Sequence, residues 1–203
     1  MKNLSNSKRY QDAKAYTESM KLPAGIYKLH VLGVKYIDNS DKGWSDQLVI
    51  SFDISEGEYA GFYNQQYKAN TNEDKKWKGN YRLYVPKDDG SEQDEWTMRR
   101  FKTVMNAFED SNPGYSWNWD ENTLKGKYIG GIFNDKEYEI NGRTGFFTNC
   151  YALISLDQMA TAKVPEPTYL KERSGSAPQP TPSSVGDGFM DIPDGIDEEL
   201  PFN

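Results

Sequence analysis

Residues 46–54, DQLVISFDI, decide the fold class of this chain because apolar and polar side chains alternate along them. Side chains of an extended strand point to opposite faces in turn, so every second residue shares a face. One face then carries the four apolar residues Leu48, Ile50, Phe52 and Ile54. The pattern predicts a strand with one face in a hydrophobic core and the other face toward solvent.

Extended segments are also predicted on both sides of this strand. Residues 26–37, IYKLHVLGVKYI, are rich in β-branched and aromatic side chains and end at a group of turn formers, which indicates a first strand. After the strand, residues 62–70, FYNQQYKAN, predict a third strand with Tyr63 and Tyr67 on one face.

The spacing of apolar residues becomes helical between Glu95 and Phe108. Ser91 or Asp94 can serve as the N-cap, and the sequence Asn-Pro-Gly at 112–114 stops the helix. The apolar face of the predicted helix consists of Phe101, Val104, Met105 and Phe108.

Two more strands are predicted in residues 125–135 and 144–156. The order of three strands, one helix and two strands is typical of the OB-fold, a five-stranded Greek-key barrel. The sequence therefore predicts an all-β domain with one helix at residues 22–163, after an N-terminal lead at residues 1–21.

The composition changes beyond this domain. Residues 164–186 are rich in Pro, Ser and Gly and bury too little apolar surface to offset their ordering entropy, which predicts a flexible linker. Residues 187–203 hold six of the 31 acidic residues and no Lys or Arg, so 25 acidic and 24 basic residues remain in the rest. A disordered acidic tail therefore carries -6 of the net charge of -7, and the body is nearly neutral.

Three segments resemble a phage and prophage group of single-stranded DNA-binding proteins. They are residues 22–36 (LPAGIYKLHVLGVKY), 46–67 (DQLVISFDISEGEYAGFYNQQY) and 195–203 (GIDEELPFN), and the similarity spans residues 22–157 and the last fifteen. The resemblance implies an OB-fold body that binds unwound DNA in replication or recombination, in the cytoplasm of a bacterial host.

The resemblance also implies that the tail recruits replication or repair proteins. Bacterial members end in Pro-Phe with a free carboxylate, whereas Asn203 follows that pair here. The residues expected to contact such partners are Ile196, Asp197, Glu198, Glu199, Leu200, Pro201 and Phe202.

Binding of unpaired DNA requires aromatic faces for the bases and cations along the phosphates. For the aromatic and basic residues around Trp77, a solvated loop whose Trp77 caps the barrel end is an equally good explanation. The densest mixture of both residue types comprises Tyr63, Tyr67, Lys68, Lys75, Lys76, Trp77, Lys78, Tyr81 and Arg82.

Further DNA-binding candidates lie outside that cluster, each with a structural alternative. Trp96 can stack on Arg100 four residues later, but a solvated helix face explains the helical cations better, and Phe133 can equally belong to the core. Trp117 and Trp119 are expected to cover a barrel end, because neighbouring acids would repel phosphate. The additional candidates are Tyr36, Trp44, Arg99, Arg100, Lys127, Tyr128, Phe133 and Arg143.

Catalytic chemistry has little support in the sequence. One His and one Cys exclude a zinc cluster of the usual spacing and an intramolecular disulfide. The acids Asp53, Glu56 and Glu58 could hold a metal as in a nuclease, but a turn explains them better. We expect no cofactor and no catalysis, and the sequence leaves a homo-oligomer open.

Two alternative functions remain at this point. The chain could be a phage adaptor or inhibitor that acts on host enzymes through its acidic tail, or a metal-dependent nuclease. No run of about 18 apolar residues predicts a membrane span, and the N-terminus lacks the apolar centre of a signal peptide.

Overall fold

The computed structural model describes residues 7–8, 21–140 and 142–170. The described residues belong to one compact unit, which ends at Leu170. The acidic tail, with all its expected partner contacts, and nearly all of the N-terminal lead lie outside the described residues. Within the described part, no helix is both long enough and apolar enough to cross a membrane.

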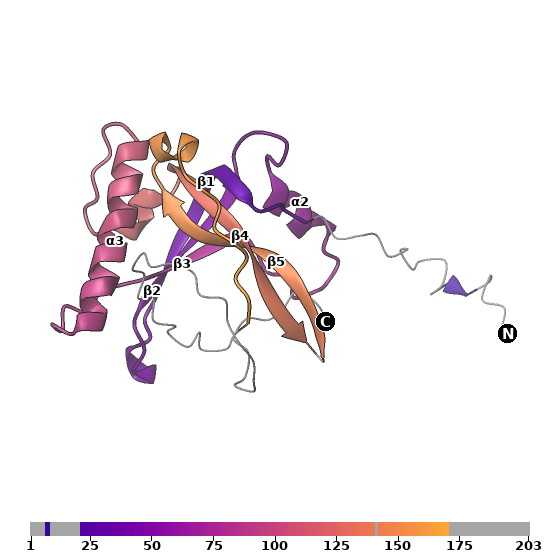
Figure 1. Ribbon diagram of the computed structural model, residues 1–203, viewed down its shortest axis with the longest axis horizontal. Coiled ribbons are helices and arrows are strands. Elements are labelled where there is room, and N and C mark those ends of the chain that lie inside the picture. The colour runs from indigo at the N-terminus through magenta and orange to yellow at the C-terminus, as the bar shows by residue number, and fades with distance from the viewer. Residues whose placement is uncertain (1–6, 9–20, 141, 171–203) are drawn as a thin grey trace, which may run out of the picture. The chain divides into compact units, whose positions relative to one another are not determined.

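The described fold is mostly a five-stranded antiparallel sheet with two helices, which confirms the all-β class (Figure 1). The strand order is β3-β2-β1-β4-β5, so β3 and β5 form the edges of an open sheet. The strands are β1 (Gly25–Ile37), β2 (Gln47–Ile54), β3 (Asn80–Tyr84), β4 (Tyr128–Ile140) and β5 (Arg143–Ile154). The helices are α2 (Phe62–Ala69) and α3 (Glu92–Ser111), and short 3-10 turns are η1 (Ser40–Lys42), η2 (Glu121–Leu124) and η3 (Asp157–Ala160).

The prediction of a third strand at residues 62–70 was wrong, because these residues form α2. The Asp53 carboxylate accepts hydrogen bonds from the backbone N–H groups of Tyr63 (2.9 Å) and Asn64 (3.1 Å), which caps the first turn of the helix. The third strand is instead β3. The domain therefore has two helices where the sequence predicted one.

The predicted helix is confirmed as α3. The Ser91 side chain accepts a hydrogen bond from the Asp94 N–H at 3.2 Å, so Ser91 is the N-cap. The helix ends at Ser111, directly before the predicted stop. Its buried residues include the four predicted ones, Phe101, Val104, Met105 and Phe108.

A β-bulge in β1 sets which side chains of this strand face the core. The register shifts between Val31 and Gly33, so one extra residue lies in β1 opposite β2. Because the alternation restarts there, Val31 before the bulge and Val34 after it both face the core, opposite Phe52 and Ile50 respectively.

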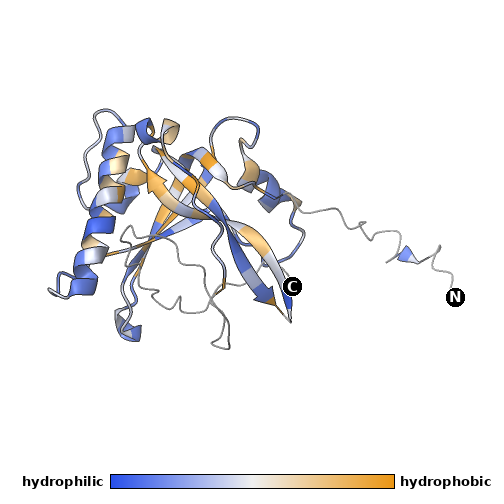
Figure 2. Cartoon of the chain, in the orientation of Figure 1, coloured by the Kyte–Doolittle hydropathy of each residue, from blue (hydrophilic) through white to orange (hydrophobic). Residues whose placement is uncertain are grey.

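The core joins strands that are not neighbours in the sheet. The rings of Phe52 in β2 and Phe133 in β4 meet edge to face with centroids 6.0 Å apart, and both are buried. Phe108 of α3 is also fully buried. Figure 2 shows apolar residues concentrated in the central parts of the strands.

The chain after η3 returns to β4. Thr168 donates its N–H to the Asp135 carbonyl and accepts from the Glu137 N–H, both at 2.8 Å. The Tyr169 ring packs edge to face on Phe146 of β5 at 5.7 Å. Residues 164–170, the start of the predicted linker, therefore pack on the domain, and the rest of that linker lies outside the described residues.

We expect Gly79→Ala to lower the free energy of unfolding by about 1–3 kcal/mol, as overpacking does. A Cβ there would meet the Phe52 carbonyl oxygen and lie 2.7 Å from the Tyr63 ring. Urea unfolding measures the effect. Gly33→Ala is the matched control, because its Cβ would meet no atom within 4 Å; equal stability of both variants would contradict this packing.

Candidate nucleic-acid interface

The outward face of β1, β2 and β3 carries a row of side chains across all three strands. Lys35 of β1 lies opposite Val49 of β2, which lies opposite Arg82 of β3. Lys35 and Arg82 are both exposed, and Arg82 donates to the Gln47 side-chain oxygen at 3.2 Å. Two cations thus flank an aliphatic side chain on a surface open to solvent.

A second row lies next to it and connects the sheet to the Trp77 loop. Gly33 lies opposite Ser51, which lies opposite Asn80. Ser51 donates to the Asn80 side chain at 2.7 Å, and Asn80 donates to the Trp77 carbonyl at 2.7 Å. Gly33 leaves open space above the backbone, so a flat ligand group can approach the sheet closely there.

A third group lies where β1 meets β4. The exposed ring of Tyr128 lies 5.0 Å from the His30 ring and 5.4 Å from Lys28 Nζ. Asn112, the C-cap of α3, bonds both backbone groups of Tyr128: it donates to the carbonyl at 2.8 Å and accepts from the N–H at 3.0 Å. The helix end therefore fixes the backbone that carries this ring.

Charge is segregated on this face. The outward positions of the three strands carry the cations Lys28, Lys35 and Arg82, and one acid, Asp53. Asp53 is only 8% exposed, and its carboxylate accepts the N–H groups at the start of α2. Those donors stabilise its charge in place. Lys28 also pairs with the loop residue Glu56 at 3.0 Å.

The structure brings some of the residues of the predicted Trp77 cluster into contact. The Tyr67 ring lies 5.8 Å from the Trp77 ring, and Lys75 Nζ lies 4.7 Å above Tyr67. Trp77 is half-buried because its indole N–H donates to the carbonyls of Phe52 and Gly79, each at 3.1 Å. Trp77 thus closes the end of β2 and β3, and Lys68, Lys75, Lys76 and Lys78 are exposed beside it.

Three of the residues predicted to contact DNA have no ring face open to solvent. Tyr63, Tyr81 and Phe133 are 7%, 5% and 0% exposed, so their rings pack in the core and cannot stack on a base. Arg100 turns toward one of them and donates to the Tyr81 hydroxyl at 2.8 Å. Burial raises the pKa of Tyr81, and the Arg100 cation offsets part of that rise.

The other residues predicted to contact DNA lie on several different surfaces. Trp96 lies against Arg99, with the guanidinium carbon 5.6 Å from the ring centroid. Exposed Trp44 lies 5.3 Å from Lys42 Nζ in the β1–β2 connection, and the Tyr36 hydroxyl there donates to Asp46. The remaining two are half-buried Lys127, whose Nζ lies 4.5 Å from the Tyr115 ring, and exposed Arg143 at the β4–β5 turn.

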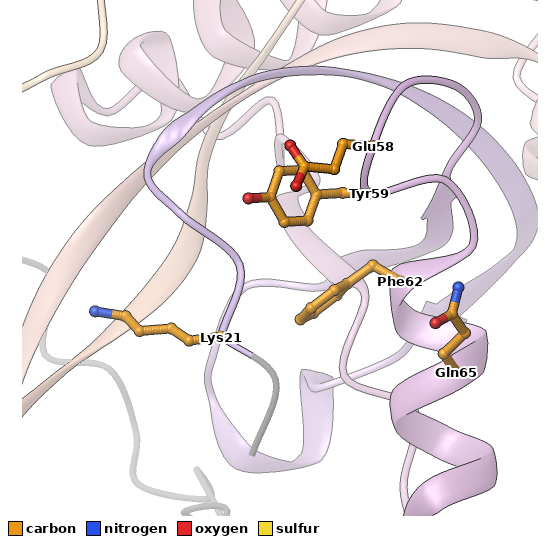
Figure 3. Close-up of a pocket in the computed structure, with 5 residues that line it drawn as sticks. All are labelled: Lys21, Glu58, Tyr59, Phe62 and Gln65. Atoms are coloured by element: carbon orange, nitrogen blue, oxygen red, sulfur yellow. The ribbon is translucent and has the colours of Figure 1, made fainter. Parts of the chain in front are cut away.

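A hollow of about 260 Å³ lies between α2 and the chain that leads into β1 (Figure 3). Figure 3 shows Tyr59 and Phe62 beside it, with Lys21 and Gln65 on opposite sides. Lys21 pairs with Asp135 at 3.4 Å, and Glu58 also lines the hollow. This mixture of charges gives no continuous path for phosphates.

The acids proposed for a nuclease site have other partners. Asp53 caps α2 and Glu56 pairs with Lys28. Across the part of the chain that the structure describes, no three His, Cys, Asp or Glu side chains form a group that could hold a metal ion.

Sequence reasoning missed Lys35 and Tyr84, which share the outward face with Arg82. Val49 of β2 pairs with Lys35, and Gln47 of β2 pairs with Tyr84. The alternation in β2, which places Val49 and Gln47 on the outward face, was the signal that could have found both residues.

A scan of this chain against models of known protein families finds no match, and a search of curated proteins finds no similar sequence.

Proposed function

We propose that this protein binds single-stranded DNA, largely without sequence preference and without catalysis, through the outward face of β1–β3 and the Tyr128 group. The observation that carries the proposal is the charge segregation on that face. Lys35 and Arg82 point outward there as exposed cations, Lys28 points outward but pairs with Glu56, and the single outward acid is turned into the start of α2. A nearly neutral domain thus presents a cationic surface.

The same face offers both kinds of contact that an unpaired strand requires. Lys35 and Arg82 can neutralise phosphates, which releases counterions and makes binding depend on salt. Tyr128 and the half-buried Tyr84 offer rings, and each base stacked on an aromatic ring contributes about 1–3 kcal/mol. A rigid duplex cannot turn its bases toward these rings.

We infer further that the domain is an OB-fold. The strand order, with β1 between β2 and β4, and a helix between the third and fourth strands are features of that barrel. Curling of the sheet supports the inference, since Phe52 and Phe133 meet across it.

The biological setting rests on the resemblance to phage and prophage single-stranded DNA-binding proteins. We propose that the chain acts in phage DNA replication or recombination in the bacterial cytoplasm. In this proposal the acidic tail at residues 187–203 recruits replication or repair proteins.

We expect the full chain to shift a labelled oligothymidine at low salt and to bind a duplex of the same length more weakly. An electrophoretic shift assay with and without Mg²⁺ measures both. Equal affinity for the duplex would contradict stacking, shortening of the oligonucleotide with Mg²⁺ would indicate a nuclease, and no shift would favour an adaptor.

We expect Lys35→Ala and Arg82→Ala to weaken oligothymidine binding and to reduce its salt dependence. For single strands, each lost phosphate contact lowers the slope of log K against log salt by about 0.7. Fluorescence titration at several salt concentrations measures the slope. The control is Lys163→Ala, which removes an exposed cation outside the strands; if it reduces the slope as much, binding is not localised to this face.

We expect removal of residues 187–203 to tighten oligothymidine binding at low salt. Six acids on a short tether stay at a high effective concentration near the cationic face and compete with phosphates. At 1 M salt the Debye length falls to about 3 Å, so the two proteins should then bind alike. Identical affinities at low salt would exclude such competition.

A further inference from the structure

A second hollow lies apart from the cationic face, on the inward side of the sheet. It has a volume of about 250 Å³, and we call it the end hollow. Its lining includes Tyr36, Leu48, Phe101, Trp117, Trp119 and Glu121. These residues come from β1, β2, α3 and the segment through η2.

Three unfavourable features meet at the end hollow. The Trp119 backbone is left-handed, with φ of 67°, although a residue with a side chain rarely adopts this conformation. Its indole is 72% exposed, with the ring stacked on Phe101 at 5.7 Å and 12°. The buried Trp117 Nε1–H finds no acceptor among the described residues. Such costs cluster where a ligand relieves them.

The mouth of the hollow is acidic. The Tyr36 hydroxyl donates to Asp46, and this hydrogen bond raises the pKa of Tyr36 to about 12. Asp38 and Glu121 act on the same hydroxyl. A ligand that fits here carries positive charge and a ring or apolar group for Trp119. Nucleic-acid phosphates do not match this set of charges.

The N-terminal segment of the chain has the matching chemistry. Residues 1–20 hold four basic residues against two acidic ones. Lys8, Arg9 and Tyr10 are consecutive, so two cations adjoin an aromatic ring. Arg or Lys above the exposed Trp119 indole gains cation–π attraction.

The length of the chain favours a segment from a second copy. Tyr36 lies eleven residues along β1 from Gly25, which is about 36 Å at the strand rise of 3.3 Å per residue. The eleven residues from Tyr10 to Lys21 reach at most about 40 Å when fully extended. Because β1 is bulged and coiled, about 36 Å is an upper limit. A segment of the same chain would still have to be largely extended to reach the hollow, whereas a neighbouring copy has no such restriction.

We propose that the end hollow binds residues 8–10 of a second copy of this chain. The Tyr10 ring packs against Trp119, and Lys8 and Arg9 face the acids. The contact is head to tail, so it can repeat along a row of molecules. It uses a different surface from the proposed DNA face and does not depend on DNA binding.

The test is a mixing experiment with two full-length variants, without DNA, by sedimentation velocity at low salt. One variant, Lys8→Glu with Arg9→Glu, keeps the hollow; the other, Trp119→Ala, keeps the segment. We expect concentration-dependent association of the wild type, none of either variant alone, and a one-to-one dimer in the mixture. A wild type that stays monomeric, or a mixture that does, would overturn the proposal.

Two further measurements complete the test. Trp96→Ala removes an exposed indole outside the hollow and should associate like the wild type; equal loss in this variant would overturn the assignment. If Trp119→Ala weakens oligothymidine binding but not association, the hollow binds a base instead.

Discussion

The extra residue in β1 determines which side chains of this strand face the core and which face outward. A strand of thirteen residues coils as it crosses the domain, and without a break its alternation would place one half of its apolar residues outside. The register shift between Val31 and Gly33 keeps both halves turned to the core. It also aligns Lys28 and Lys35 on the outward side, so one irregularity serves both the core and the proposed DNA face.

The Asp53 carboxylate connects this sheet to α2. It is buried at the end of β2 and accepts N–H groups from the first turn of the helix, which positions Phe62 and Tyr63 in the core. The same bonds hold a negative charge away from the outward surface. A capping interaction therefore contributes to the electrostatics of the face as well as to folding.

The sequence predicted the elements whose period is unambiguous. The alternation in β2 and the helical spacing in α3 each fit one type of element, and the structure has both. Tyr63 and Tyr67 are four residues apart, a spacing that fits two strand repeats and also about one helical turn, so residues 62–70 were misassigned. Burial of Tyr81 and Phe133 depends on how distant strands pack, which local spacing does not contain.

The clamp on Tyr128 has a thermodynamic consequence. Asn112 bonds both polar groups of the Tyr128 backbone, and α3 in turn is anchored by buried Phe108. A ring on a backbone that is already ordered loses little further conformational freedom when a ligand packs on it. Preorganisation of this kind favours slow release of any ligand that packs on the ring, because less of the binding free energy is spent on ordering the protein.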